Sequence, residues 1–81
     1  MNVNEQSSDA QKELINFGLR LKSLRLASGI SQEQLAMLAQ LDRTYISGIE
    51  RGVRNVGVIN IFRIAHALKV PPAELFTLDV M

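Results

Sequence analysis

The chain has 81 residues, of which 47% are hydrophobic and only 5% aromatic, and its formal net charge is +1. This length suits a single domain near the lower limit at which one apolar core holds a fold, so association with a second copy is expected. Cysteine is absent and the only histidine is His66, which excludes disulfides, thiolate metal sites and a cluster of metal ligands. No apolar run reaches the roughly 18 residues of a membrane span, and the N-terminus is polar, so a soluble, cytoplasmic protein is expected.

The charge is distributed unevenly along the chain. Residues 1–18 carry three acidic side chains and one lysine, whereas residues 19–54 carry six basic side chains and three acidic ones, a local balance of +3. Positive charge concentrated in one part of a small domain favours a nucleic-acid partner. Basic segments are also common as ordinary solvated faces, so charge alone is only suggestive.

The first segment predicts one helix preceded by a tail. Residues 1–9 have no apolar period and are expected to form a flexible tail, while residues 10–78 are expected to form a single domain. From Asp9, a candidate N-cap, apolar residues recur at helical spacing until Gly29 ends the helix; they are Leu14, Phe17, Leu21 and Leu24. Gly18 lies inside this helix at a cost of up to about 1 kcal/mol relative to Ala, so another backbone is expected close to it.

The stretch from Ser31 to Gly52 predicts two short helices joined by a tight turn. Ser31 and Gln34 have the spacing of a capping box, which begins the first helix. The turn falls at about Gln40 and Leu41, and Asp42 is the expected N-cap of the second helix.

The second of these helices has a short inward face, formed by Ile46, Ile49, part of Tyr45 and the stem of Glu50. The residues left facing outward are Arg43, Thr44, Ser47, Gly48 and Arg51. Ser and Gly are poor helix formers, and Gly costs about 1 kcal/mol in a helix interior. Small residues at these positions are expected to leave room for another molecular surface that comes close to this helix.

The last part of the chain predicts a helix from Val58 to Leu68 and a short fifth helix from Ala73 to Leu78. The longer helix is apolar over more than half its circumference, which is more than a small monomer can bury. Part of it is therefore expected to contact a second subunit, and the candidate interface residues are Ile59, Phe62, His66 and Leu75. As a lone histidine, His66 is more typical of packing than of metal binding.

The segments SQEQLA and IERG, at residues 31–36 and 49–52, resemble the motif of the phage-repressor and Cro-like helix-turn-helix family. The resemblance covers roughly residues 17–76. Within that family, LDRTYISGIERGVRNVGVINI is most similar to the controller proteins of restriction-modification systems, small homodimers that regulate their own gene and that of the endonuclease. The resemblance implies an all-α, compact five-helix bundle of the lambda-repressor-like type, with the second and third helices forming the helix-turn-helix.

The resemblance also implies roles for individual residues. Contacts with DNA bases in the major groove are expected from Arg43, Thr44 and Ser47. Contacts with the DNA backbone are expected from Gln32, Tyr45, Arg51, Arg54 and Asn55, although Arg54 could also reach a base and Tyr45 could instead cover the core. Arg25 and Glu50 match an internal ion pair that links the first helix to the third.

The expected partners are therefore double-stranded DNA and a second copy of the chain, with no membrane, cofactor, metal or small-molecule ligand. Two alternatives stay open: a phage-type repressor, and the DNA-binding antitoxin of a toxin-antitoxin pair that acts through a protein partner. An enzyme is not expected, because the sequence has no phosphate-binding glycine loop, no cysteine and no partner for its histidine.

Overall fold

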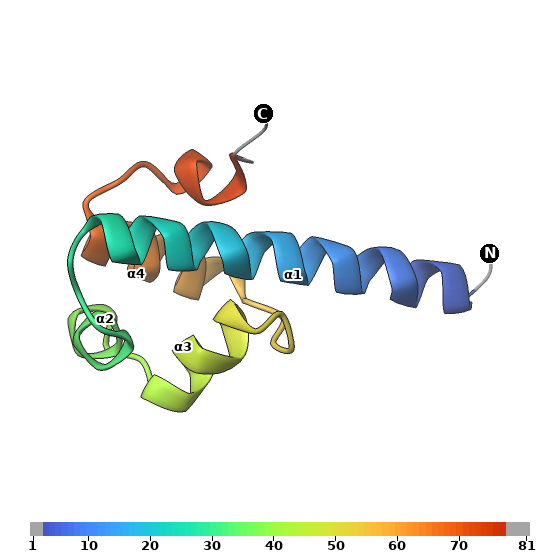
Figure 1. Ribbon diagram of the computed structural model, residues 1–81, viewed down its shortest axis with the longest axis horizontal. Helices are drawn as coiled ribbons and strands as arrows, with labels where there is room; N and C mark the ends of the chain where they lie inside the picture. Colours follow the sequence, from blue (N-terminus) through green and yellow to red (C-terminus); the bar gives the residue numbers. More distant parts are fainter. Residues whose placement is uncertain (1–2, 78–81) are drawn as a thin grey trace.

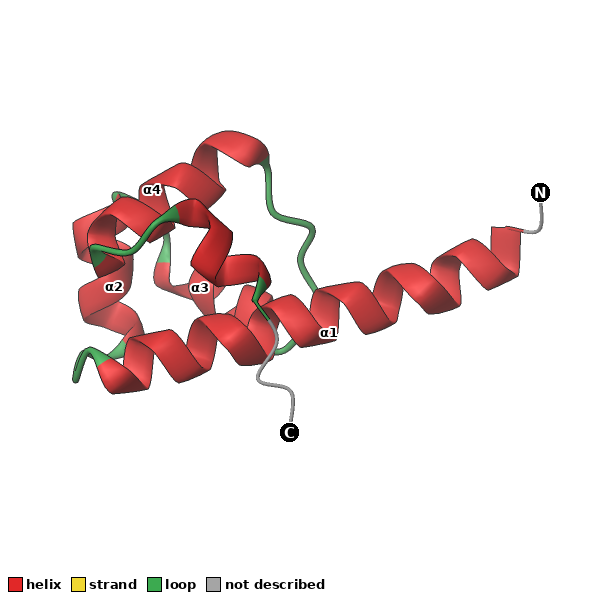
Figure 2. Ribbon diagram, turned by 90° about the horizontal axis from the view of Figure 1, so that it is seen from above, coloured by secondary structure: helices red, strands yellow, loops and turns green. Residues whose placement is uncertain are grey.

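The computed structural model describes the backbone of residues 3–77 and the side chains of residues 9–77. Within this part of the chain, four α-helices and one short 3-10 helix follow one another without a strand (Figures 1 and 2). They are α1 (Val3–Ala27), α2 (Gln32–Ala39), α3 (Arg43–Glu50), α4 (Val58–Leu68) and η1 (Pro72–Phe76). The predicted all-α class is confirmed, and no described helix is long and apolar enough to cross a membrane.

The helix α1 begins at Val3, six residues before the expected cap at Asp9. Its first turns project beyond the body of the protein (Figures 1 and 2). The predicted start of this helix at Asp9 is therefore wrong, whereas the flexibility of residues 1–9 stays a prediction. Apolar periodicity detects only a helix that packs on something, whereas residues 3–8 contain no Gly or Pro and extend an existing helix without a new nucleation step.

The core takes large side chains from every helix. Those with less than 2% of their surface exposed are Leu21, Leu35, Ile46, Ile49, Ile64 and Leu75. Burying a side chain of this size contributes about 1.5 to 3 kcal/mol, so these six residues supply a substantial part of the stability of the domain.

Two predictions for the C-terminal part need correction. The expected α-helix from Ala73 is a 3-10 helix over Pro72–Phe76, because five residues that follow a proline are too few for a regular α-helix; Leu78 lies outside the described residues. Leu75 was expected at a subunit interface but is fully buried in the core. Arg20 holds this segment on α1, since its Nε donates to the Glu74 carbonyl at 2.7 Å and its Nη2 to Glu74 Oε1 at 2.8 Å.

Glycines allow α1 and α3 to approach each other at two points. A Cβ atom on Gly18 would overlap the carbonyl oxygen of Ile49 and lie 2.8 Å from that of Glu50, which confirms the predicted close backbone contact. After α3, Gly52 adopts φ +77°, and a Cβ there would lie 2.7 Å from Ile15 Cγ1. The backbone of α3 is thus seated directly on α1.

Candidate nucleic-acid interface

The helix α2 begins with the predicted capping box. Ser31 Oγ accepts a hydrogen bond from the Gln34 backbone N–H at 3.0 Å, and Ser31 N–H donates to Gln34 Oε1 at 2.8 Å. The helix ends at Gln40, whose φ of 59° lies in the left-handed region and reverses the chain direction. The N–H of Leu41 then donates back to the Ala36 carbonyl at 2.8 Å. These local bonds form the tight turn that leads into α3.

The N-terminus of α3 is capped by Asp42, as predicted. Asp42 Oδ1 accepts hydrogen bonds from the Thr44 backbone N–H at 2.8 Å and from Thr44 Oγ1 at 2.6 Å. The bond from the Thr44 hydroxyl, followed by the bond from its N–H and the nearby charge of Arg54, lowers the pKa of Asp42. Because the proton of the Thr44 hydroxyl is used in this bond, Thr44 presents an acceptor oxygen and a methyl group to an incoming partner.

The predicted ion pair between Arg25 and Glu50 is present and buried. Arg25 Nε donates to Glu50 Oε2 at 2.6 Å and Arg25 Nη2 to Glu50 Oε1 at 3.1 Å. Arg25 Nη1 also donates to the Ile30 carbonyl at 2.8 Å. The hydrogen bond with Glu50 raises the pKa of Arg25, so the guanidinium stays charged. This pair fixes the end of α3 relative to α1 and to the loop before α2.

Gln32 joins the same network, which the sequence did not predict. Its Nε2 donates to Glu50 Oε1 at 3.0 Å, so the first turn of α2 is tied to the last turn of α3. One amide N–H is used in this bond, and a primary amide carries a second N–H for another acceptor. Gln32 also lines a polar groove of about 400 Å³, together with Arg25, Ser31, Glu33 and Arg43. The N-terminal ends of α2 and α3 therefore share one concave polar surface.

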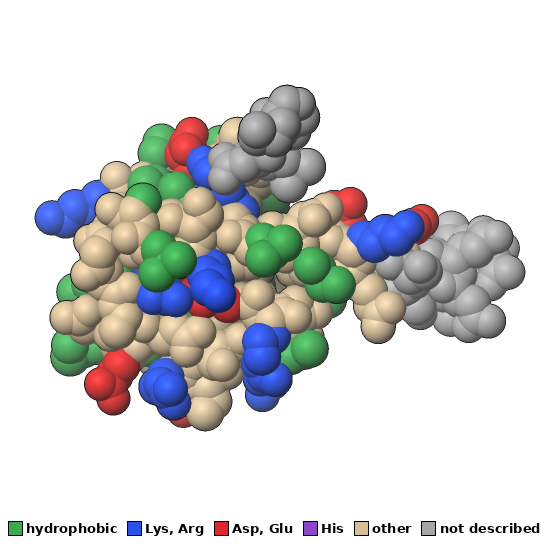
Figure 3. Space-filling view, in the orientation of Figure 1, with side chains coloured by type: hydrophobic (Ala, Val, Ile, Leu, Met, Phe, Trp, Pro, Cys, Tyr) green, Lys and Arg blue, Asp and Glu red, His purple; other side chains and the backbone are tan. Residues whose placement is uncertain are grey.

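One face of α3 is accessible to solvent. Arg43, Thr44 and Arg51 are exposed and Ser47 is partly exposed, and their spacing places them on the same side of the helix. Figure 3 shows Lys and Arg side chains over α3 and over the loop that follows it. The exposed carboxylate of Asp42, the residue before Arg43, caps the helix and offsets one of the two arginine charges. The row is a positively charged ridge on the surface.

Gly48 is not exposed to solvent beside this ridge, contrary to the sequence prediction. It is buried, and a Cβ on it would lie 2.6 Å from Cγ of Arg54. The aliphatic part of the exposed Arg54 therefore covers Gly48. Sequence periodicity along α3 alone could not detect this contact, because the covering side chain comes from the loop after the helix.

Tyr45 takes part in the packing between α3 and α4. Its ring packs against the core, and its hydroxyl accepts a hydrogen bond from Asn60 Nδ2 at 3.2 Å, which connects α3 to α4. Asn60 was not predicted from the sequence, although a single amide side chain in the apolar segment VINIFRIAHAL is a signal that a polar partner lies nearby. Asn55 and Arg54 are exposed in the loop between these helices.

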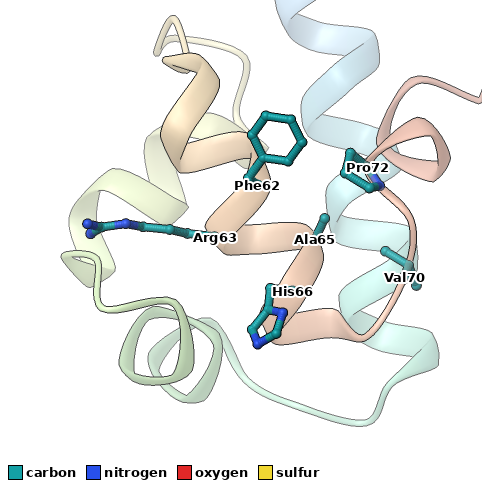
Figure 4. A pocket seen from close by; sticks show the side chains of 6 residues that line it. All are labelled: Phe62, Arg63, Ala65, His66, Val70 and Pro72. Carbon is teal, nitrogen blue, oxygen red and sulfur yellow. The ribbon is translucent and has the colours of Figure 1, made fainter.

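The exposed face of α4 contains three of the four predicted interface residues. Ile59 is 66% exposed, Phe62 is 54% exposed, and His66 is also exposed. A hollow of about 560 Å³ lies beside them, lined by Phe62, Arg63, Ala65, His66, Val70 and Pro72. In Figure 4, Phe62 and Pro72 stand at the upper end of this hollow and His66 at the lower end, while Arg63 extends away from the other five side chains.

The turn between α2 and α3 and the exposed ridge on α3 are the features of a helix-turn-helix protein. The profile of the helix-turn-helix family matches residues 21–75 of the chain. The chain belongs to this family, whose members are DNA-binding regulators and not enzymes.

Its close relatives are controller proteins of restriction-modification systems. Control protein C.BamHI from Bacillus amyloliquefaciens is 52% identical over 60 residues, which cover 73% of this chain and 74% of that protein. The crystal structure of the controller protein C.AhdI from Aeromonas hydrophila is 54% identical, with a TM-score of 0.79 over 80% of this chain and 98% of that chain. The controller protein C.Esp1396I, solved as a tetramer in complex with its natural 35 base-pair operator, is 41% identical, with a TM-score of 0.72 over 78% of this chain and 83% of that chain.

Proposed function

We propose that this chain is the homodimeric controller protein of a restriction-modification system, which binds palindromic operator sites in the major groove and regulates its own gene. The observation that carries the proposal is the exposed basic ridge on α3, held in place by the buried network of Arg25, Glu50 and Gln32. Its similarity to controller proteins supports the same function. A related controller protein has been solved with its operator DNA.

Arg43 and Thr44 are the proposed base-reading residues, with Ser47 one turn further along α3. The guanidinium of Arg43 offers two donors that match the O6 and N7 acceptors of guanine. Thr44 offers a methyl group for the thymine methyl and an acceptor oxygen for the amino group of adenine or cytosine, since its own proton goes to Asp42.

Contacts with the DNA backbone are proposed for residues that border the ridge. They are Gln32, Tyr45, Arg51, Arg54 and Asn55. Gln32 lies at the N-terminus of α2, where the backbone N–H groups and the helix dipole favour a phosphate. The hydroxyl of Tyr45 accepts from Asn60 and therefore has its proton available for a phosphate oxygen.

The dimer is proposed to form through the exposed face of α4 that carries Ile59, Phe62 and His66. A second copy placed on this face would cover the two exposed apolar side chains and the adjoining hollow. Two-fold symmetry then requires the two α3 helices to lie about 34 Å apart to enter successive major grooves on one side of the duplex.

A fluorescence-anisotropy titration with the DNA upstream of the gene tests the proposal. At about 0.1 M salt, we expect binding to this DNA to be at least 1,000-fold tighter than to a scrambled duplex of the same length and composition, the lower end of known specificity ratios. Equal affinity for both duplexes would reject the sequence-specific function. Neighbouring methyltransferase and endonuclease genes would distinguish a controller protein from a phage repressor.

A further inference from the structure

Gly48 and Arg54 form a contact that links α3 to the loop after it. If Gly48 carried a Cβ, this atom would lie 2.6 Å from Arg54 Cγ, 3.3 Å from its Nε and 3.5 Å from its Cδ. The stem of Arg54 therefore runs directly over the helix backbone at Gly48, through space that any other residue would fill.

This path carries the guanidinium of Arg54 back along α3. Gly48 lies one turn after Thr44 on the same side of the helix. The positive charge of Arg54 is also felt at Asp42, where it contributes to the lowered pKa of the carboxylate. Arg54 belongs to the loop at the other end of α3, yet its charge acts on the N-terminal cap of this helix.

We propose that Gly48 is a positioning residue for DNA recognition, whose missing side chain seats Arg54 against α3 so that its guanidinium meets the DNA beside Thr44. The inference rests on the proposed function and specifies how one of its contacts is formed. Gly48 touches no DNA in this arrangement, and its effect on binding passes through Arg54.

Helix stability does not explain a glycine at this position. Gly48 has no positive φ, so its backbone conformation is open to any residue, and alanine would favour the helix by about 1 kcal/mol. The competing explanation is that DNA itself comes too close to α3 for a side chain at this point. The two explanations predict different results when Arg54 is absent.

The test combines Gly48→Ala and Arg54→Ala in a double-mutant cycle, with binding measured on the upstream DNA. We expect each single variant to lose roughly tenfold in affinity, within the range found for single side-chain contacts with DNA. In the Arg54→Ala background, Gly48→Ala should cause no further loss, because there is no side chain left to displace. A further loss of similar size in that background would overturn the proposal in favour of direct clearance for DNA.

Gly57→Ala is the matched control, since Gly57 has no heavy atom within 4 Å of a Cβ and no positive φ. It should bind DNA as the wild type does. Thermal melting should show that Gly48→Ala folds at least as stably as the wild type. Wild-type affinity of Gly48→Ala for the upstream DNA would also overturn the proposal.

A measurement without DNA separates this inference from the proposed function. The 15N resonance of Arg54 Nε in the free protein should shift toward that of a freely solvated arginine in Gly48→Ala and stay unchanged in Gly57→Ala. An unchanged Arg54 resonance in Gly48→Ala would overturn the positioning role. If the resonance shifts as expected but the wild-type protein shows no sequence-specific binding, the contact between Gly48 and Arg54 stands. The proposed DNA-binding function, on which the positioning role depends, is then rejected.

Discussion

Removal of Glu50 should be among the most damaging single changes in the part of the chain that the structure describes. Its carboxylate accepts hydrogen bonds from Arg25 Nε at 2.6 Å, Arg25 Nη2 at 3.1 Å and Gln32 Nε2 at 3.0 Å. In Glu50→Ala, the buried guanidinium of Arg25 keeps only its bond to the Ile30 carbonyl. A charge is then left in the interior without a counter-charge.

The expected loss follows from the cost of an unpaired buried charge. Breaking a buried ion pair costs about 3 to 5 kcal/mol. A chain of 81 residues is expected to have a total stability of about 4 to 12 kcal/mol. Glu50→Ala should therefore remove about a quarter or more of the stability, and a wild type at the lower end of this range would unfold at room temperature.

Replacing both partners should behave differently. In the double variant Arg25→Met, Glu50→Leu, no charge is buried and two apolar side chains fill similar space, so the free energy of unfolding should return to within about 1 to 2 kcal/mol of the wild type. Binding to the upstream DNA should stay weakened, because Gln32 has lost the acceptor that ties α2 to α3.

Urea denaturation followed by circular dichroism measures these free energies, and anisotropy measures binding. The conservative variant Arg25→Lys retains the charge but offers no planar fork, and it should lie between the wild type and Glu50→Ala. If the double variant is as unstable as Glu50→Ala alone, the ion pair is itself a net source of stability and the reasoning from desolvation is refuted.

Four further predictions concern other positions. Gly18→Ala should lower the free energy of unfolding by about 1 to 3 kcal/mol or more in urea denaturation, because its Cβ meets backbone atoms of α3 that cannot rotate away; wild-type stability would contradict the close contact. The lowered pKa of Asp42 means that its cap is fully effective above pH of about 4 and weakens as the pH falls through the folded-state pKa, so the loss of melting temperature in Asp42→Ala should be largest near pH 7 and should shrink as the solution is acidified. Arg43→Ala should reduce discrimination between operator and scrambled DNA by about 1 to 3 kcal/mol, whereas Gln32→Ala should weaken binding to both duplexes evenly. Phe62→Glu should convert the dimer to a monomer in sedimentation equilibrium, and a persistent dimer would place the interface elsewhere.

Local features of the fold could be predicted from the sequence. The caps at Ser31 and Asp42 and the turn at Gln40 depend on residues only two to five positions apart, so the sequence contains all the groups that form them. The close approach at Gly18 was predicted because a glycine inside a long helix is unfavourable without a compensating contact.

Other features depend on how distant segments meet and could not be predicted in this way. The direction of Leu75 is set by the attachment of η1 to Arg20, which lies 54 positions from Glu74. The burial of Gly48 depends on the path of the loop that carries Arg54, and helical periodicity contains no information about that path. The bond from Gln32 to Glu50 spans 18 positions and forms only when α2 and α3 are packed.

The groups that hold α3 on α1 at the two glycine contacts are different from the side chains that α3 exposes to solvent. Gly18 and Gly52 seat the helix through backbone atoms and the side chain of Ile15, and none of these groups lies on the exposed ridge. Arg43 and Ser47 can therefore be exchanged without repacking this contact. Related proteins could acquire new operator preferences by substitution at such positions while the same scaffold persists, so divergence in target sequence need not be accompanied by divergence in stability.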